Sequence, residues 1–333
     1  GAREPERDPA LKGVPWSARD KQFVKLCVSS PGVVEQVIAN WRKKGMRGSV
    51  NATENDLGIG YCHCGPCMAL DRLDPGDYEG KTLASVTDRY VWFANRLARA
   101  AAAFKPGTEA AMYVYNECYQ PPKYETVDPQ VVAGVVPRRI DLTHLEEILG
   151  GWKKAGLRKM MLRPNWPFHY GCSSLPFGHH QQLYEAFRCA YRHGAVSADI
   201  DHLMLQWTIH GLADYALCKG MLYPDAPFER WEAEYCSAFG DAAEDARAYF
   251  RYWQERVWEA RILPDYDAIV RSDPVDNFLR AIWRRGLGAY FKDADFDAAD
   301  ALLEAGLKKQ LTPLERERLE SLRLLNGDSR RVI

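Results

Sequence analysis

The sequence predicts an α/β fold, a TIM-like (β/α) barrel, followed by an α-helical C-terminal region. Four short apolar runs, at 48–56, 111–117, 159–166 and 195–202, each end abruptly in acids, amides or aromatic residues. A segment of helical periodicity separates each run from the next, which is the alternation expected of parallel βαβ units. Reactive groups of a (β/α) barrel lie where its strands end, so these polar ends predict one edge of an active site.

The segments between the strands carry the start and stop signals of helices. The first helix ends in basic residues followed by Gly45, and the second ends at Pro106-Gly107. A continuous apolar run at 131–136 is typical of a buried parallel strand. Helices are thus predicted at 31–44, 85–104, 142–155 and 181–192.

From about residue 205 the pattern is helical, which sets the domain organisation. We expect an extended lead-in at 1–20, the barrel portion at 21–222 and the helical C-terminal region at 223–333. Thr312-Pro313 predicts that the last helical stretch is a hairpin of two helices. Five strands, or six with a strand at 205–209, are fewer than the eight of a complete barrel. Because the chain also begins with Gly, we expect that it was cut or processed upstream and that some N-terminal strands are missing. An open parallel sheet is the alternative.

Composition narrows the range of partners. Basic and acidic residues number 44 and 45, so nucleic acid is not an expected partner. No apolar stretch approaches the ~20 residues that cross a bilayer, so no membrane span is expected. The strand ends carry acids, amides, Trp and Tyr rather than a glycine-rich phosphate loop, which indicates an oligosaccharide or polysaccharide substrate and no cofactor for catalysis. Oligomeric state, sugar and linkage are left open.

Three cysteines fall within six residues after the first strand, at Cys62, Cys64 and Cys67. Thiolates at this spacing with a fourth ligand elsewhere are the pattern of structural zinc; Cys27 is the nearest candidate for the fourth, and His63 is a second. Two other interpretations stay open. The cysteines form disulfides if the protein is exported, or they are simply buried thiols.

Glycosidic bonds are commonly cleaved by two carboxyl groups across a sugar ring. Glu117 follows a Tyr-rich strand and directly follows Asn116, an arrangement common among barrel glycosidases. We therefore expect Glu117 to act as general acid/base in a retaining mechanism; alternatively it only caps the turn. An acetamido group of the substrate could replace the second carboxylate as nucleophile.

Asp199 and Asp201 alternate along one strand, so their side chains point the same way. Such a pair could couple and separate its two pKa values, and we expect one of them to be the second catalytic group. Alternatively, one forms a structural ion pair with Arg163 on the neighbouring strand. Other polar and aromatic residues at the strand ends are expected to bind the sugar: Asn55, Asp56, Tyr115, Asn116, Tyr119, Arg163, Asn165, Trp166 and Trp207.

Several segments together form a recognisable pattern: Leu26-Cys27-x-x-x-Pro31, Asn55-Asp56 then Cys62-x-Cys64-x-x-Cys67, Asp88-Arg89-Tyr90-x-x-Phe93-x-Asn95, Tyr115 with Pro121-Pro122, Arg163-Pro-Asn165, Asp199-x-Asp201 and Trp207-x-x-x-Gly211-x-x-x-Tyr215. This combination resembles a bacterial barrel family of largely unknown function that includes glycoside hydrolase family 163, the endo-acting β-N-acetylglucosaminidases of complex N-glycans. The resemblance spans residues from about 20 to 325. It implies a TIM-like barrel with a helical C-terminal region, further strands upstream, and export from the cytoplasm.

The sequence therefore predicts a glycoside hydrolase that acts on a glycan. A non-catalytic carbohydrate-binding barrel, or an inactive fragment that lacks upstream strands, is the alternative. A zinc enzyme with catalytic cysteines is disfavoured, because four cysteine ligands close the coordination sphere.

Overall fold

The computed structural model describes residues 24–55, 60–72, 85–137, 141–164, 175–200, 207–272 and 278–333. The chain divides into two compact units. The first comprises Gly1–Pro137, Thr143–Pro164 and Arg192–Asp199, and the second comprises Arg138–Leu142, Asn165–Tyr191 and Ile200–Ile333. A parallel sheet lies in the first unit and helices make up the second, so the predicted α/β class with a helical C-terminal region is confirmed.

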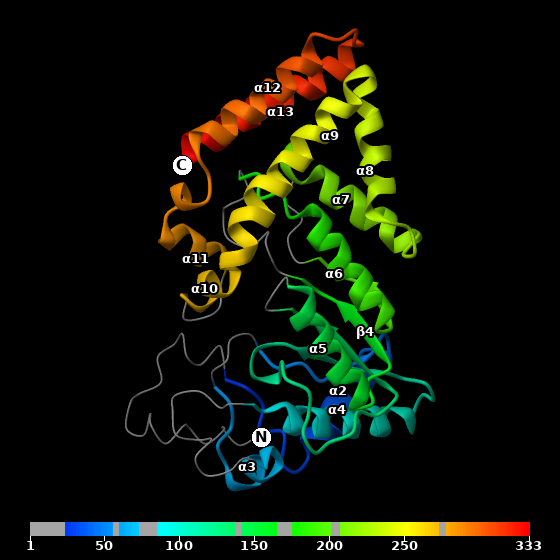
Figure 1. Ribbon diagram of the computed structural model, residues 1–333. Helices are drawn as coiled ribbons and strands as arrows, with labels where there is room; N and C mark the ends of the chain where they lie inside the picture. Colours follow the sequence, from blue (N-terminus) through cyan, green and yellow to red (C-terminus); the bar gives the residue numbers. More distant parts are fainter. Residues whose placement is uncertain are drawn as a thin grey trace. The chain divides into compact units, whose positions relative to one another are not determined.

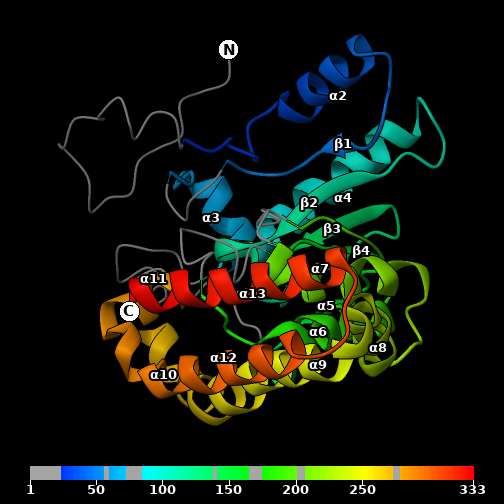
Figure 2. The same ribbon diagram turned by 90° about the horizontal axis from the view of Figure 1, so that it is seen from above.

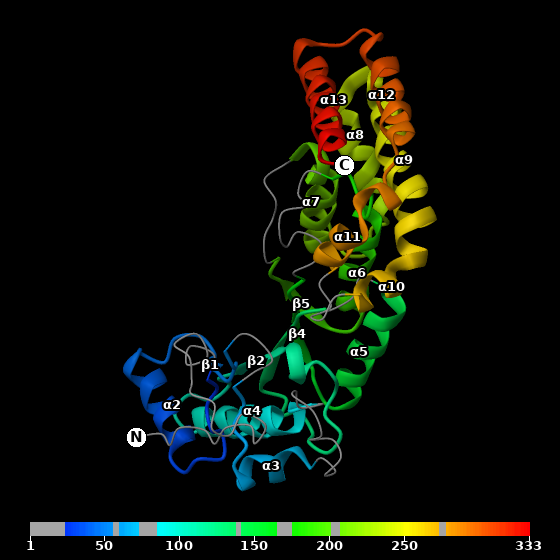
Figure 3. The same cartoon turned by 90° about the vertical axis from the view of Figure 1, so that its left-hand side faces the viewer.

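Among the described residues, the sheet of the first unit has five parallel strands in the order β1-β2-β3-β4-β5, of which Figure 3 labels β1, β2, β4 and β5. They are β1 (Val50–Asn51), β2 (Ala110–Val114), β3 (Val131–Val135), β4 (Lys159–Leu162) and β5 (Ala195–Ala198). Each lies in an apolar run that the sequence singles out as a strand. The order follows the chain without the reversal of a doubly wound sheet. It is shared by (β/α) barrels and by open sheets wound in one direction, and closure into a barrel stays a prediction.

Among the described residues, the first unit holds four α-helices: α2 (Val33–Lys43) before β1, α3 (Gly65–Asp71) and α4 (Thr87–Ala102) between β1 and β2, and α5 (Leu142–Lys154) between β3 and β4. Helix α4 packs against β2 and β3 through small and branched residues such as Val91, Ala94 and Leu97, which are fully buried. Apolar positions three and four apart place these residues on one face of the helix. The same helix carries Asp88, Arg89 and Tyr90 at its start, so the core anchors the polar segment that builds the site.

The second unit holds the helical segments from α6 to α13 (Figure 1). They are α6 (His180–Arg192), α7 (Trp207–Leu222), α8 (Phe228–Cys236), η4 (Ser237–Ala242), α9 (Ala243–Tyr252), the π-helical η5 (Trp253–Ile262), η6 (Leu263–Asp265), α10 (Tyr266–Arg271), α11 (Phe278–Arg285), η7 (Leu287–Ala289), α12 (Asp293–Leu307) and α13 (Pro313–Val332). Helix α7 already begins at Trp207, so the possible sixth strand at 205–209 is wrong over 207–209. Residues 207–209 instead form the first turn of the 16-residue helix α7. No helix among the described residues is long and apolar enough to cross a bilayer.

Helices α12 and α13 form the predicted hairpin and lie side by side (Figure 2). Thr312 is the N-cap of α13 and builds a reciprocal capping box with Glu315. The Glu315 backbone N–H donates to Thr312 Oγ1 at 3.4 Å, and the Thr312 N–H donates to Glu315 Oε2 at 2.8 Å. The pair satisfies two backbone donors that the first helical turn leaves without partners.

Replacing Thr312 by Ala is expected to lower the free energy of unfolding by about 1 kcal/mol, because one helix-end donor loses its acceptor. Ser321→Ala in the middle of the same helix is the matched control and should change it by no more than about 0.5 kcal/mol. Urea unfolding of both variants measures the difference. Equal effects of the two substitutions would contradict a capping role for Thr312.

Candidate active site

Glu117 lies directly after β2 on the short 3-10 turn η3 (Asn116–Cys118). Asn116 takes a φ of 48°, a left-handed conformation that Asn adopts more readily than most residues. The Cys118 N–H donates to the Tyr115 carbonyl at 2.9 Å, and the Val86 N–H donates to the Glu117 carbonyl at 3.0 Å. The second bond ties the turn to the start of α4, so the backbone of Glu117 is held from two sides.

A second carboxyl group, that of Glu54, lies three residues beyond β1, the strand that pairs with β2. Both Glu54 oxygens are buried and have no hydrogen-bond partner among the described residues. The Cys118 thiol and the Glu54 backbone nevertheless lie close enough to lower the pKa of this carboxyl group. Burial raises the pKa of Glu54 to about 7; Lys25 opposes the rise and the charge of Glu117 adds to it. Near neutral pH, Glu54 therefore carries a proton for a large part of the time.

Tyr61 stands beside both acids. Its hydroxyl donates to Glu117 Oε2 at 3.2 Å, and its ring meets Tyr90 edge-on with the centroids 6.0 Å apart. Lys25 Nζ lies 4.7 Å from the centroid of the Tyr61 ring, although Lys25 is only 2% exposed. Burial raises the pKa of both Tyr61 and Tyr90, so both phenols stay protonated and can donate hydrogen bonds.

These contacts place one carboxyl group that holds a proton near neutral pH beside another that accepts a hydrogen bond. A protonated carboxyl group and a second carboxyl group beside it can divide the work of general acid and of base or nucleophile. The strand ends of a parallel sheet are the usual position for such groups.

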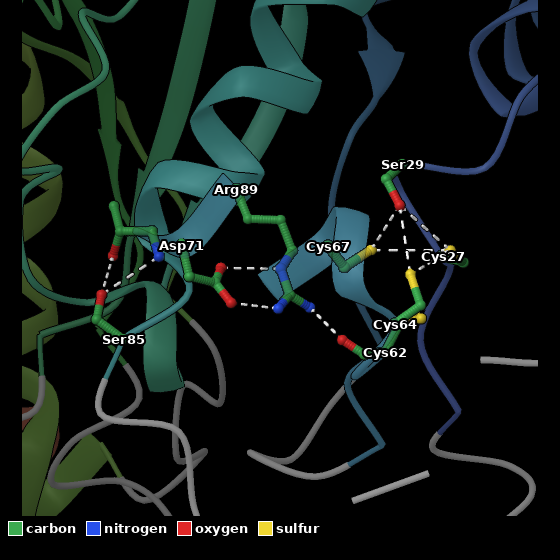
Figure 4. A network of polar contacts seen from close by, with 9 residues as sticks. Cys27, Ser29, Cys62, Cys64, Cys67, Asp71, Ser85 and Arg89 are labelled. Carbon is green, nitrogen blue, oxygen red and sulfur yellow. Dashed lines mark hydrogen bonds and ion pairs between the residues drawn. The ribbon is translucent and has the colours of Figure 1, made fainter. Parts of the chain in front are cut away.

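The four cysteines Cys27, Cys62, Cys64 and Cys67 form a cluster in which all the sulfurs lie within 4.8 Å of one another (Figure 4). All four are free thiols, and Cys27 Sγ is 3.7 Å from the sulfurs of both Cys64 and Cys67. A disulfide would place Cys27 Sγ about 2.05 Å from one of these two sulfurs and farther from the other, whereas the two distances are equal. This set of ligands could hold a metal ion, as the spacing in the sequence predicts.

The start of α4 supports both the cluster and the loop after Glu117. Arg89 forms a buried ion pair with Asp71 at the end of α3, and its Nη1 donates to the Cys62 carbonyl at 2.8 Å (Figure 4). Asp88 accepts hydrogen bonds from the backbone N–H groups of residues 123–125. Asn95 donates to the Thr126 carbonyl at 2.8 Å. Residues 88–95 of α4 therefore hold the carbonyl of Cys62, the end of α3 and the loop at 123–126.

The structure places Asp199 in the alternative role considered for it. Its carboxylate lies 3.3 Å from Arg163 Nε across neighbouring strands, and its side chain is 55% exposed. The Arg163 guanidinium also lies 5.5 Å from the centroid of the Tyr113 ring. Asp199 is thus the partner of a cation in an ion pair, and Asp201 lies outside the described residues.

Other residues predicted to bind sugar have varied positions. Tyr119 is buried, stacks on His144 and accepts a hydrogen bond from the Trp152 indole through its carbonyl. Asn55 is exposed and donates to the Val24 carbonyl at 2.9 Å. Tyr115 and Asn116 are half-buried beside Glu117, and Trp207 is an exposed residue at the start of α7 in the second unit. Asp56, Asn165 and Trp166 lie outside the described residues.

Glu54 is not among the candidate residues that the sequence singles out. It lies in the polar end of the first strand, one residue before the candidates Asn55 and Asp56. The usable signal in the sequence is its position as the first acid after the first strand. Lys25 and Tyr61 carry no such signal, because only the fold brings them to the two acids.

A protein-family model described as a domain of unknown function (DUF4838) matches residues 14–251. No curated protein and no solved structure matches the chain significantly. The matched range includes the whole sheet, both acids and the cysteine cluster.

Proposed function

The chain belongs to the family of the domain of unknown function DUF4838, and from the chemistry of its site we propose that it is a glycoside hydrolase acting on a glycan. The observation that carries this proposal is the pair of carboxyl groups, Glu54 and Glu117, at the ends of adjacent parallel strands. Hydrolysis of a glycosidic bond needs a proton donor for the leaving oxygen and a second carboxylate at the cationic centre.

In this proposal Glu54 is the general acid and Glu117 the second carboxylate. Glu54 is suited to donation because burial raises its pKa to about 7. Tyr61 donates to one oxygen of Glu117 and orients it. This division reverses the expected role of Glu117 as acid/base, because the two Glu54 oxygens are buried and burial raises the pKa of Glu54. As predicted from the sequence, the proposed mechanism is retaining, with Glu117 or a substrate acetamido group as nucleophile.

Asp199 is a weaker candidate for the second carboxylate. It is more than half exposed and neutralised by Arg163. A carboxylate that is exposed to water and paired with a cation is poorly placed to act as a desolvated nucleophile. We assign Asp199 and Arg163 to joining the ends of β4 and β5. Together with Asn55, Tyr115 and Asn116, these two residues would bind sugar hydroxyls.

For the cysteine cluster we propose a structural zinc ion. Four thiolates fill a tetrahedral sphere and leave no open position for a substrate or water, so the metal would supply rigidity rather than a Lewis acid. The catalytic chemistry then rests on the carboxyl groups alone.

The test is hydrolysis of a panel of aryl glycosides and complex N-glycans by the wild-type chain and by Glu117→Gln. Turnover of one sugar, reduced roughly 10²-fold or more by Glu117→Gln, is the expected result. Glu109→Gln is the matched control, because Glu109 precedes the same strand at its opposite end, and it should leave turnover unchanged. Full activity of Glu117→Gln would remove Glu117 from the mechanism. Saturable glycan binding without turnover would favour the non-catalytic carbohydrate-binding alternative.

A further inference from the structure

Two short segments connect the cysteine cluster with the carboxyl pair. Tyr61, which donates to Glu117, is the residue immediately before Cys62. Lys25, which lies over the Tyr61 ring, is two residues before Cys27. The Lys25 N–H donates to the Gly60 carbonyl at 3.0 Å and joins the two segments. The first segment therefore supplies Cys27 to the cluster and Lys25 to the carboxyl pair, and the second supplies Tyr61 to the carboxyl pair and leads into the other three cysteines.

Two separations between sulfurs of the cluster match those of a tetrahedral metal site. Zinc–sulfur bonds of about 2.3 Å place tetrahedral ligands about 3.8 Å apart. Cys27 Sγ lies 3.7 Å from two of the other sulfurs. The Ser29 hydroxyl lies 3.0 Å from Cys67 Sγ and 3.5 Å from Cys64 Sγ, where it can donate to thiolates. A donor of this kind orients the ligands and lowers the repulsion between their charges.

Helix α4 gives the cluster a second mechanical link to the acids. Arg89 binds the carbonyl of Cys62 and pairs with Asp71, which ends the helix that carries Cys67. The next residue, Tyr90, contacts the Tyr61 ring. A shift of the Cys62–Cys67 loop would therefore move Tyr61 from two directions, through its own backbone and through α4.

We propose that Cys27, Cys62, Cys64 and Cys67 bind one Zn²⁺ ion and that this ion holds Tyr61 and Lys25 in place beside Glu117 and Glu54. Without the metal, the two segments lose their common anchor. Tyr61 then no longer orients Glu117. The catalytic consequence rests on the proposed function, whereas metal binding and the position of Tyr61 do not.

The first experiment measures metal and thiols on the wild-type protein purified without added chelator. About one zinc ion per chain is expected, with the four clustered thiols protected from alkylation until a chelator is added. Substitution by Co²⁺ should produce the absorption of a tetrahedral thiolate site. Disulfides within the cluster, or thiols that are reduced and bind neither zinc nor cobalt, would overturn the proposal.

The second experiment uses matched serine variants and zinc titration against a competing chelator. Ser29→Ala is expected to weaken zinc binding 10- to 100-fold, because the thiolates lose a hydrogen-bond donor. Ser30→Ala, at the neighbouring position, should leave the affinity unchanged. Equal affinities of the two variants would show that Ser29 does not contact the metal ligands.

The third experiment tests the positioning of Tyr61 by amide hydrogen exchange, with and without zinc. Metal removal should accelerate exchange at residues 116–118 as well as within the cysteine loop, and leave β3 unchanged as the internal reference. Acceleration confined to the cysteine loop would overturn the positioning role and leave only a local metal site. Because exchange is measured without substrate, this result is independent of whether the protein hydrolyses glycans.

Discussion

Glu54→Gln is expected to lower kcat/KM for glycan hydrolysis by about 10²- to 10⁴-fold near neutral pH, the usual contribution of a positioned general acid. Gln has nearly the same shape but cannot transfer a proton. The loss should be smallest for substrates with good leaving groups such as aryl glycosides, because their departure needs little protonation. Comparable losses for aryl and natural substrates would contradict the assignment of Glu54 as the acid.

The pH dependence of the wild type provides the second part of the same test. Burial raises the pKa of Glu54 to about 7, so the active protonated form is lost as the pH rises through this value. The kcat/KM of the wild type should fall on the alkaline side with a midpoint near 7. The residual activity of Glu54→Gln should lack this limb. An alkaline limb that persists in the variant would assign the titration to another group.

The free energy of unfolding should also depend on pH through the Glu54 carboxyl group. The folded-state pKa of Glu54 is above its ordinary value of 4.5, so the buried acid binds its proton more tightly in the folded chain. The stabilisation that this tighter proton binding gives to the folded state is fully present below about pH 4.5 and is lost as the pH rises through about 7. Relative to wild type, Glu54→Gln should gain roughly 3 kcal/mol between these pH values. Exposed Glu35→Gln is the control and should show no such trend; a flat Glu54→Gln difference would contradict the burial of the acid.

Arg89→Met is expected to lower the free energy of unfolding by about 3–5 kcal/mol, because it leaves the buried Asp71 carboxylate without its cation. The side chains of Arg89 and Asp71 are 1% and 0% exposed, and the Cys62 carbonyl loses a donor as well. Arg99→Met on the same helix is the control. Arg99 is 69% exposed and pairs with Asp128 at the surface, so its loss should cost at most about 1 kcal/mol.

Denaturant unfolding of both arginine variants at neutral pH, with zinc present throughout, measures the two costs. The unfolding midpoints of the two variants should differ clearly if the buried ion pair stabilises the fold as expected. A cost below about 1 kcal/mol for Arg89→Met would mean that water or another donor replaces the guanidinium. In that event α4 would not be the support that joins the cysteine loop to the site.

Much of the local structure could be predicted from the sequence because its signals act within a few residues. The apolar runs became β1 to β5, and the glycine and proline stops ended the helices near the predicted residues. Thr312-Pro313 marked the start of α13 because a capping box is complete within four residues. The thiol spacing within Cys62–Cys67 likewise marked a cluster, since three of its four members are neighbours along the chain.

The tertiary structure decided which polar residues meet. Asp199, chosen for its alternation along a strand, is paired with Arg163, whereas Glu54 is buried beside Glu117. Burial and the charges that surround a carboxyl group come from segments distant in the chain, here Lys25, Tyr61 and Tyr90. Periodicity reports which face a residue occupies but not what packs over it. The sequence by itself thus determined the elements, their order and the polar strand ends, while the packing of separate segments determined which acid holds its proton.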